Sequence, residues 1–409
     1  MHKLELKKMA KAYREVANQR KEENKTFYAN NLKALTDEQN IAELIVDSSD
    51  SNCIDGYFHV DKDEYKLVKF YDVIFGKGKA MNEDDLVKVS GVCFYYCGFS
   101  MCGFSNIHFE NCTFVGCDFI ECYTLGMIAV FSNCSFLSRL KGKKSIDDMP
   151  SLFESCEFTI KLINCDVSQL VFDKTHFYFT NFENVCLYDS IFLDCSFDTM
   201  KICGCDLRNT KIVNPKFIEF NIEDLDKKTK VSRNTFLGSI NYSKKEKREV
   251  RYAVEVYDAF SELFENSKIM DYGGEYFFLS QKTEIGNMNG FTKLKSILSY
   301  ITCGYGERPS FSLMVAMALV ILCGTLYLLF GVTVNNEVIS FKPSLENLFP
   351  SWDKLILCYH FSLVTFSTVG YGNVVPIGGS ILVSAVEMVL GVIMVGIWVS
   401  TLVRKMTRN

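Results

Sequence analysis

The longest hydrophobic stretches of the chain lie in its last quarter. Residues 310–333 form a nearly uninterrupted apolar run and residues 377–403 form a second, each long enough for one membrane crossing. Between them, residues 352–366 combine a polar start with about a dozen mostly apolar residues, fewer than the roughly 20 that a crossing needs. This third segment is predicted to be a re-entrant helix, because backbone can leave helical form at membrane depth where it lines a cavity or is buried in protein.

Upstream of this region, hydrophobic residues recur with a period of five. The first run is Phe94, Phe99, Phe104, Phe109, Phe114 and Phe119. The second is Val167, Phe172, Phe177, Phe182, Leu187, Phe192, Phe197, Ile202, Leu207, Ile212 and Phe217, after interruptions near 124–131 and 137–153. A five-residue period fits neither an ordinary helix nor an ordinary strand, and a short period that is fixed over many units indicates a solenoid.

A second set of small or apolar residues lies two positions before these large ones. In the first run it consists of Val92, Cys97, Cys102, Ile107, Cys112 and Cys117, and in the second it includes Cys165, Cys195 and Cys205. Free cysteine behaves as a small hydrophobe and is often buried, so packing is the favoured interpretation of these thiols. A redox-active or soft-metal-binding ladder is the alternative.

Helical spacing flanks the repeat on both sides. In residues 1–50 it is carried by Leu4, Met9, Tyr13 and Val16, which predict a solvated or tetramer-contacting helix. After the repeat it is carried by Val250, Ala253, Val254, Tyr257, Phe260 and Phe264. Gly273-Gly274 is predicted to break that helix, with a second one starting around Glu275.

One more amphipathic helix is predicted just before the first membrane crossing. Its apolar face consists of Phe291, Leu294, Ile297, Leu298 and Ile301, a composition suited to a membrane interface. The pattern as a whole predicts four parts: an N-terminal helical segment (1–50), a capped solenoid (51–225), a helical linker (226–303) and a two-transmembrane domain (304–409).

Composition excludes several functional classes. The net charge of −5 argues against a nucleic-acid partner. The 17 cysteines have no zinc-site spacing, and the charged start of the chain is unlike an export signal, so we expect reduced thiols. The five histidines are dispersed, and there is no nucleophile–base set or phosphate loop. We therefore expect neither an enzyme nor a cofactor.

The sequence Thr368-Val369-Gly370-Tyr371-Gly372 follows the predicted re-entrant helix. A dehydrated cation needs rings of backbone carbonyl oxygens, and inward-pointing carbonyls at successive residues require backbone angles that Gly370 and Gly372 adopt at little steric cost. Thr368 can add its hydroxyl, while Val369 and Tyr371 are expected to point away from the pore. A second Gly-Tyr-Gly, at residues 304–306, lacks Thr-Val and is interpreted as a turn.

This motif resembles the selectivity filter of potassium channels, and residues 310–408 resemble the two-transmembrane bacterial potassium channels. The resemblance implies a homotetramer in which residues 368–372 bind K⁺ as the permeant ion and the only metal. It also implies that the second crossing lines the pore, with Gly391 and Gly396 near a gating hinge; close helix packing is an equal alternative for these glycines.

Several positions depart from the family pattern. Asn373 stands where aspartate is usual, Val364 where some members have glutamate, and Ser367 where threonine is common. We therefore expect neutral contacts to support the filter. Glu387, within the second crossing, either faces the pore and binds cations or forms a buried contact behind the pore helix, and the buried contact is favoured.

The five-residue repeat resembles the pentapeptide-repeat family. This resemblance covers roughly residues 90–220 and implies a right-handed, four-sided β-helix with four repeats per coil. In that fold the large residue and the small residue two before it both point inward.

Together these features predict a multidomain channel of the cell (inner) membrane. Positive charge flanks both crossings on the same side, at Lys293, Lys295 and Arg308 and at Arg404, Lys405 and Arg408, which places both termini in the cytoplasm. The leading hypothesis is a tetrameric, potassium-selective channel in the lipid bilayer, biased by its cytoplasmic repeat domain. Alternatives are a weakly selective cation channel or a membrane-tethered module that recruits a protein partner. The gating ligand or partner is not identified by the sequence.

Overall fold

A computed structural model of the chain describes residues 3–39, 44–136, 151–223, 228–335, 337–341 and 350–408. These residues divide into two compact units, 1–287 and 288–409. The first unit holds the solenoid and the second holds both candidate membrane spans, so each is described separately. Of the predicted features, the repeat interruption at 137–150 and the side chains of Leu4 and Arg408 lie outside the described residues.

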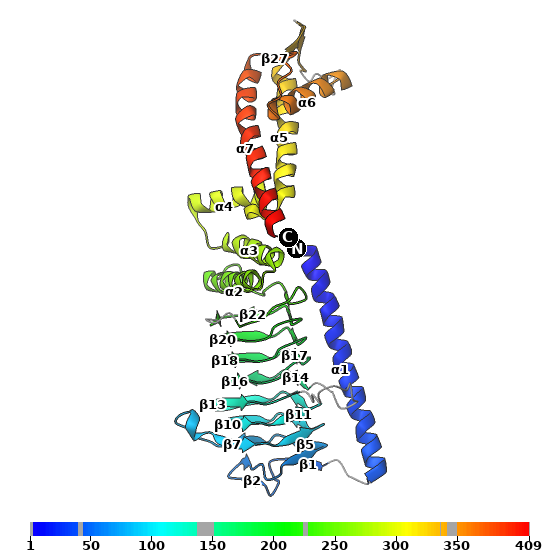
Figure 1. Cartoon of the computed structure of the whole chain (residues 1–409), viewed down its shortest axis with the longest axis vertical. Helices are drawn as coiled ribbons and strands as arrows, with labels where there is room; N and C mark the ends of the chain where they lie inside the picture. Colours follow the sequence, from blue (N-terminus) through cyan, green and yellow to red (C-terminus); the bar gives the residue numbers. More distant parts are fainter. Residues whose placement is uncertain are drawn as a thin grey trace. The chain divides into compact units, whose positions relative to one another are not determined.

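Parallel strands coil repeatedly around one axis in the first unit (Figure 1). A nine-stranded sheet has the order β1-β5-β9-β12-β14-β17-β19-β21-β24, and a second sheet contains twelve strands. The strands of the nine-stranded sheet are β1 (Leu44–Val46), β5 (Val68–Tyr71), β9 (Gly98–Ser100), β12 (Asp118–Ile120), β14 (Leu152–Glu154), β17 (Val171–Asp173), β19 (Ile191–Leu193), β21 (Lys211–Val213) and β24 (Phe236–Leu237).

The other walls are formed by the twelve-stranded sheet and a short three-stranded sheet. The former contains β2 (Cys53–Ile54), β3 (Tyr57–Phe58), β6 (Ile74–Gly76), β7 (Val87–Ser90), β10 (Gly103–Glu110), β13 (Tyr123–Ser132), β15 (Glu157–Phe158), β16 (Ile160–Ile163), β18 (His176–Glu183), β20 (Ser196–Cys203), β22 (Lys216–Phe217) and β23 (Phe220–Ile222). The latter contains β4 (Glu64–Lys66), β8 (Cys93–Tyr95) and β11 (Thr113–Val115). Isolated bridges continue this wall from Thr113 through Ser135 to Lys230.

Four pentapeptides make one coil, as the register between strands demonstrates. Phe94 pairs with Phe114, and Phe99 pairs with Phe119, in parallel register. Residues 20 apart therefore stack, and ring pairs such as Phe99–Phe119 lie nearly parallel with centroids 4.6 Å apart. Stacked aromatic pairs contribute about 0.5–1.5 kcal/mol beyond the area that they bury.

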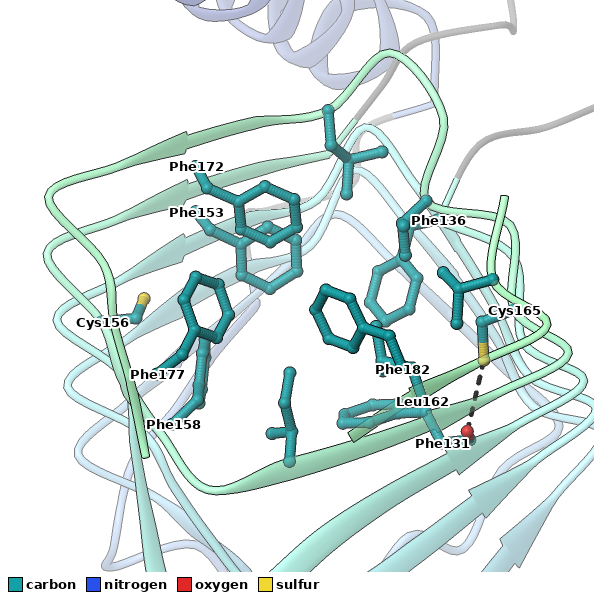
Figure 2. Close-up of a cluster of buried hydrophobic side chains, with 14 of the residues drawn as sticks. Phe131, Phe136, Phe153, Cys156, Phe158, Leu162, Cys165, Phe172, Phe177 and Phe182 are labelled. Carbon is teal, nitrogen blue, oxygen red and sulfur yellow. Dashed lines mark hydrogen bonds between the residues drawn. The ribbon is translucent and has the colours of Figure 1, made fainter. Parts of the chain in front are cut away.

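The solenoid interior is filled by the large residues of the repeat. In Figure 2 the labelled phenylalanines from different walls, among them Phe153, Phe158, Phe182 and Phe136, point into one shared core. All members of the two predicted runs are at most 7% exposed. The predicted four-sided β-helix is confirmed, and it extends beyond the predicted end at residue 225 to β24.

The corners of the coil explain the polar residues of the repeat. Two positions after the large residue the backbone is left-handed, for example at Asn111 (φ 55°), Asn184 (φ 53°) and Asn214 (φ 52°). Asparagine tolerates this conformation better than most residues because its short polar side chain can hydrogen-bond locally. Local backbone geometry therefore favours asparagine at this position without requiring it, since Tyr96, Met101 and Phe179 are also left-handed there.

The cysteines two positions before the large residues are buried, and all 17 cysteines are free thiols. In three in-register columns they follow one another along the coil axis: Cys97 and Cys117; Cys102, Cys122 and Cys156; and Cys112, Cys134 and Cys165. Each thiol donates to a backbone carbonyl of the preceding coil, as Cys165 does to Phe131 O (3.2 Å; Figure 2). The described residues contain no group of three or more His, Cys, Asp or Glu side chains placed so that it could hold a metal ion.

The N-terminal helix α1 (Lys3–Gln39) lies along the nine-stranded sheet (Figure 1). Of its side chains that the structure describes, Leu6, Ala17 and Lys21 are buried, and Tyr13 packs on Phe236 with ring centroids 5.0 Å apart. The prediction of a solvated or tetramer-contacting helix was therefore wrong for this face. Val16, predicted to share the apolar face, is 41% exposed.

Ion pairs fix α1 to the sheet. Arg14 pairs with Asp194 at 2.6 Å, and its guanidinium holds the pKa of that carboxyl below its usual range. Lys21 lies between Asp173 (2.5 Å) and Glu154 (2.7 Å). Because Lys21 and Asp173 are nearly buried, their pairing is required to offset the cost of removing both charges from water.

Two antiparallel helices, α2 (Lys247–Asn266) and α3 (Met270–Glu284), pack on the last coils and share their core. The helix break occurs at residues 267–269 and not at Gly273-Gly274, as predicted from the sequence. Those glycines lie inside α3, where a Cβ on Gly273 would be 2.6 Å from Glu265 Cγ and 3.2 Å from Ser261 O. Glycine is needed here for close helix packing, so it does not end the helix.

The predicted linker 226–303 is therefore divided between the two units. The second unit begins with α4 (Gly290–Cys303) and the 3₁₀ turn η2 (Gly304–Gly306), which is the second Gly-Tyr-Gly sequence. On α4, Phe291, Leu294 and Leu298 are at least 60% exposed, so its apolar stripe faces outward.

Three further helices complete the second unit: α5 (Pro309–Phe330), α6 (Trp352–Phe366) and α7 (Gly379–Arg408). Residues 309–330 and 379–407 are long and apolar enough to cross a membrane. Residues 334–351, predicted as a loop, include part of a three-stranded antiparallel sheet. Its strands are β25 (Val332–Val334), β26 (Glu337–Ile339) and β27 (Val374–Pro376).

Candidate selectivity filter and its support

The filter sequence begins where the short helix α6 ends. With 15 residues, α6 is about 22 Å long, shorter than the roughly 30 Å hydrocarbon core of a bilayer. It packs against α5 and α7, close beside α5 in Figure 1. The helix ends at Phe366, and the amides of Ser367 and Val369 still donate to Leu363 O (3.0 Å) and Val364 O (3.1 Å).

Backbone handedness alternates along the filter sequence. Thr368, Gly370 and Gly372 are left-handed, with φ of 58°, 60° and 78°, whereas Val369 and Tyr371 between them are not. In an ordinary strand successive carbonyls point to opposite sides, but alternating handedness turns successive peptide groups toward the same side. Alternation at this spacing can therefore create a row of carbonyl oxygens, the arrangement that a dehydrated cation requires.

The Val369 and Tyr371 side chains are exposed in the single chain, at 57% and 66%. Tyr371 lies nearly parallel to His360 of α6, with ring centroids 6.0 Å apart. The tyrosine ring thus contacts the helix that carries the filter.

The strand β27 holds the other end of the filter. It pairs with β25, with Val375 opposite Thr333 and Pro376 opposite Val332. Since β25 directly follows α5, the filter is fixed between α6 at its start and the end of α5 at its exit. The sequence did not predict this sheet, because its strands are three residues long and pair across about 40 residues.

The predicted supporting residues have different environments. Val364 is half-buried near the end of α6, and the Ser367 hydroxyl donates to its carbonyl at 3.2 Å. Asn373 is exposed. No charged side chain stands at any of these three positions.

Glu387 of α7 is buried, with 1% of its surface exposed, and contacts both α5 and α6. Tyr327 of α5 donates to Glu387 Oε2 at 2.6 Å, and Ser362 of α6 contacts Oε1. Of the two interpretations offered by the sequence, this position corresponds to the buried contact behind the pore helix. The two partners could not be predicted, because nothing in the local sequence indicates which hydroxyls of α5 and α6 meet α7.

The two candidate hinge glycines also differ. A Cβ on Gly391 would lie 2.2 Å from the carbonyl oxygen of Phe366, whereas a Cβ on Gly396 would meet no atom within 4 Å. Gly391 therefore allows α7 to approach the end of α6. Gly396 has no such packing role within the chain.

An ion pair that sequence analysis missed joins the far ends of the spanning helices. Glu307, which precedes α5 and is 4% exposed, pairs with Arg404 near the end of α7 at 3.0 Å. The only sign of this ion pair in the sequence was that Glu307 is an acidic residue within the basic segment that precedes the first crossing. The contact fixes the end of α7 that is farthest from the filter.

Comparison with known proteins identifies part of the second unit. A family model described as "Ion channel" matches residues 337–408, which contain α6, the filter sequence and α7. No curated protein matches the chain. Residues 337–408 therefore form an ion-channel domain.

The solved structures that are similar to the chain include three pentapeptide-solenoid examples. Full-length QnrB1, a plasmid-mediated fluoroquinolone resistance protein, has 13% identity over 42% of this chain and 94% of its own, with a TM-score of 0.19. A trypsin-treated QnrB1 variant has 14% identity over 32% of this chain and 61% of its own (TM-score 0.16). The third is HetL, a pentapeptide repeat protein involved in heterocyst differentiation regulation from the cyanobacterium Nostoc sp. strain PCC 7120. It has 10% identity over 51% of this chain and 97% of its own, with a TM-score of 0.14. The assignment of a pentapeptide-repeat solenoid rests on the five-residue period and the coil register.

Proposed function

We propose that the protein is a homotetrameric, potassium-selective channel of the cell membrane, in which residues 368–372 of four copies form the selectivity filter. The observation that carries the proposal is the alternating handedness of Thr368, Gly370 and Gly372, directly after a helix too short to span a bilayer. The ion-channel family match over residues 337–408 supports a channel of some kind.

In the proposed mechanism the filter replaces the hydration shell of K⁺. Each copy contributes one quarter of each carbonyl ring, and Thr368 adds its hydroxyl oxygen at the inner mouth. Val369 and Tyr371, exposed in one copy, pack against the neighbouring copies and hold the ring open. No residue acts as a catalyst, and K⁺ is the permeant ion.

The proposed topology has two crossings and both termini in the cytoplasm. Arg308 directly precedes α5, Arg404 and Lys405 lie near the end of α7 that is remote from the filter, and Lys293 and Lys295 lie on α4, the helix before α5. Positive charge next to short connections is retained on the cytoplasmic side. The filter would then open toward the exterior.

Selectivity tests this proposal directly. Purified full-length protein in liposomes is expected to pass K⁺ much faster than Na⁺. Gly370→Ala is expected to abolish selective flux, because a left-handed alanine costs roughly 1–2 kcal/mol in each of four copies. Gly378→Ala, a matched change at another left-handed glycine (φ 52°) outside the filter, is the control.

Equal flux of the two cations would favour a weakly selective cation channel. No flux from full-length protein, together with capture of a protein by its solenoid, would favour a membrane-tethered interaction module. Selective conduction by Gly370→Ala would exclude residues 368–372 as the filter.

The solenoid is proposed to bias opening of the channel. Its interior is one continuous core of stacked aromatic rings, so a force applied to one coil is transmitted to its neighbours. No ligand is implied by its surface chemistry. The corresponding test compares the open probability of channels with and without the first unit.

A further inference from the structure

A buried polar cluster joins the three helices that surround the filter. Tyr327 of α5 and Ser362 of α6 are fully buried, and both contact Glu387 of α7. Ser362 also lies 2.8 Å from the backbone oxygen of Val320 in α5.

The number of protons available to Ser362 is the decisive feature. A serine hydroxyl has one proton to donate, yet Ser362 Oγ contacts two oxygens, Val320 O and Glu387 Oε1. A backbone carbonyl can only accept. If Ser362 donates to Val320, the proton between Ser362 and Glu387 has to come from Glu387.

An ionised Glu387 does not satisfy this geometry. A carboxylate only accepts, so one of the two contacts of Ser362 would bring two acceptor oxygens together without a proton. Among the described residues, Glu387 forms no ion pair with a basic side chain that could offset a buried negative charge. A buried charge without a paired cation is strongly unfavourable.

We infer that Glu387 is a neutral carboxylic acid that donates its proton to Ser362, and that it is a positioning residue for the pore helix. All donors in the resulting chain are then matched: Tyr327 donates to Oε2, Glu387 donates to Ser362, and Ser362 donates to Val320. The chain ties α6 to α5 and α7 one turn before the helix ends.

The consequence for conduction rests on the proposed channel function, whereas the protonation state does not. Ser362 lies six residues before Thr368, so its contacts fix the helix that orients the filter. Loss of the chain would leave the pore helix free to rotate and would disturb the alignment of the four filters.

Infrared spectroscopy of the full-length protein in lipid bilayers tests the protonation state. The wild type at neutral pH is expected to show the carbonyl stretch of a protonated carboxylic acid, absent from Glu387→Gln and shifted in heavy water. If Glu387→Gln instead lacks a carboxylate stretch that the wild type shows, and the acid band is unchanged, the inference is overturned. This readout is independent of whether the protein conducts.

Variants test the positioning role. Glutamine can donate to Ser362 and accept from Tyr327, so the K⁺ flux of Glu387→Gln is expected to stay within about threefold of wild type. Glu387→Ala leaves buried groups unpaired, and its K⁺ flux is expected to fall by about tenfold or more. Ser384→Ala is a matched control, because Ser384 lies on the same helix and bonds to Ile381 O of its own turn.

Equal flux and selectivity in Glu387→Ala and wild type would refute the positioning role. Because Glu387→Ala could fail by misfolding, Ser362→Ala is measured as well. It is expected to shift the acid band, since the acid proton loses its acceptor, and an unchanged band would contradict the proposed donor. A wild type that conducts nothing would refute the channel proposal and leave the infrared result intact.

Discussion

Inward-facing polar side chains of the solenoid share one hydrogen-bonding role. Cys117, Cys195 and Cys205 each donate to the carbonyl of the residue 23 positions earlier, at 3.3–3.4 Å. Ser190 and Thr210 make the equivalent bond, at 2.6 and 2.7 Å. Cysteine is therefore one of several residues that can satisfy a carbonyl at this corner of the coil.

This role predicts that the ladder thiols are unreactive in the folded protein. The ladder cysteines are buried and so inaccessible to a polar reagent, and burial also raises the pKa of the Cys117 and Cys195 thiols. A polar maleimide is expected to react quickly with at most the five partly exposed cysteines, Cys53, Cys93, Cys186, Cys203 and Cys303, and with the other twelve after denaturation. Mass spectrometry of labelled peptides provides the measurement.

The variant Cys156→Ser tests whether the hydrogen bond of a ladder thiol, and not its reactivity, is what the fold requires. Serine can donate to Phe119 O as Cys156 does, so its free energy of unfolding is expected to fall by no more than about 1 kcal/mol. Fast labelling of Cys195 in folded protein would instead indicate an accessible, redox-competent thiol.

The two glycines of α7 are predicted to respond differently to alanine. Gly391→Ala places a methyl group 2.2 Å from a backbone oxygen, so α7 and α6 have to separate, and assembly or conduction should be lost. Gly396→Ala meets no atom and should fold normally, with a reduced open probability if Gly396 is the hinge. Size-exclusion chromatography and single-channel recording distinguish the two results.

An undisturbed assembly in Gly391→Ala would show that the contact between α6 and α7 is not maintained in the tetramer. Unchanged gating in Gly396→Ala would remove this residue as the hinge candidate.

At the scale of elements, the contact of α1 with the solenoid depends on buried charge. Lys21→Ala leaves Asp173 without its cation in a nearly buried position, and is expected to destabilise the first unit by about 2–4 kcal/mol. Lys25→Ala is the control, because the Lys25–Glu22 pair is exposed and contributes well under about 1 kcal/mol. Urea unfolding of both variants measures the difference.

A second substitution distinguishes lost pairing from lost packing. Asp173→Asn in the Lys21→Ala background removes the unpaired charge and should recover part of the stability. No recovery would indicate that Lys21 acts through the packing of its aliphatic chain.

Elements defined by local patterns could be predicted from the sequence. The solenoid, both spans and the short helix before Thr368 follow from a strict period or a long apolar run, signals that need no knowledge of distant partners. The left-handed backbone of Gly370 and Gly372 likewise follows from residue type.

Features that depend on long-range contacts could not be predicted. The binding of α1 to the coils is one, although the outward residues Leu152, Val171 and Ile191 form an apolar column that could have indicated a covering element. The partners of Glu387 are another. Gly273 was misassigned because the same residue type can end a helix or permit close packing, and tertiary contacts decide which.

At the scale of the whole molecule, removal of the first unit tests regulation. The division at residue 287 makes deletion of residues 1–287 more suitable than deletion of 1–225, which would leave α2 and α3 without the coils on which they pack. We expect the shortened protein to conduct K⁺ with altered open probability, measured by voltage clamp in planar bilayers. Identical open probability under all conditions would exclude a regulatory role.

The helix α1 also changes how the solenoid should unfold. Coils of a solenoid contact their immediate neighbours, and such arrays can fray from one end. The contacts of α1 run from Glu154 in β14 to Phe236 in β24 and so bridge five consecutive strands of one wall. With this brace in place the spanned coils are expected to melt as one cooperative unit, and the mechanical stiffness of the repeat is set in part by a segment that does not belong to it.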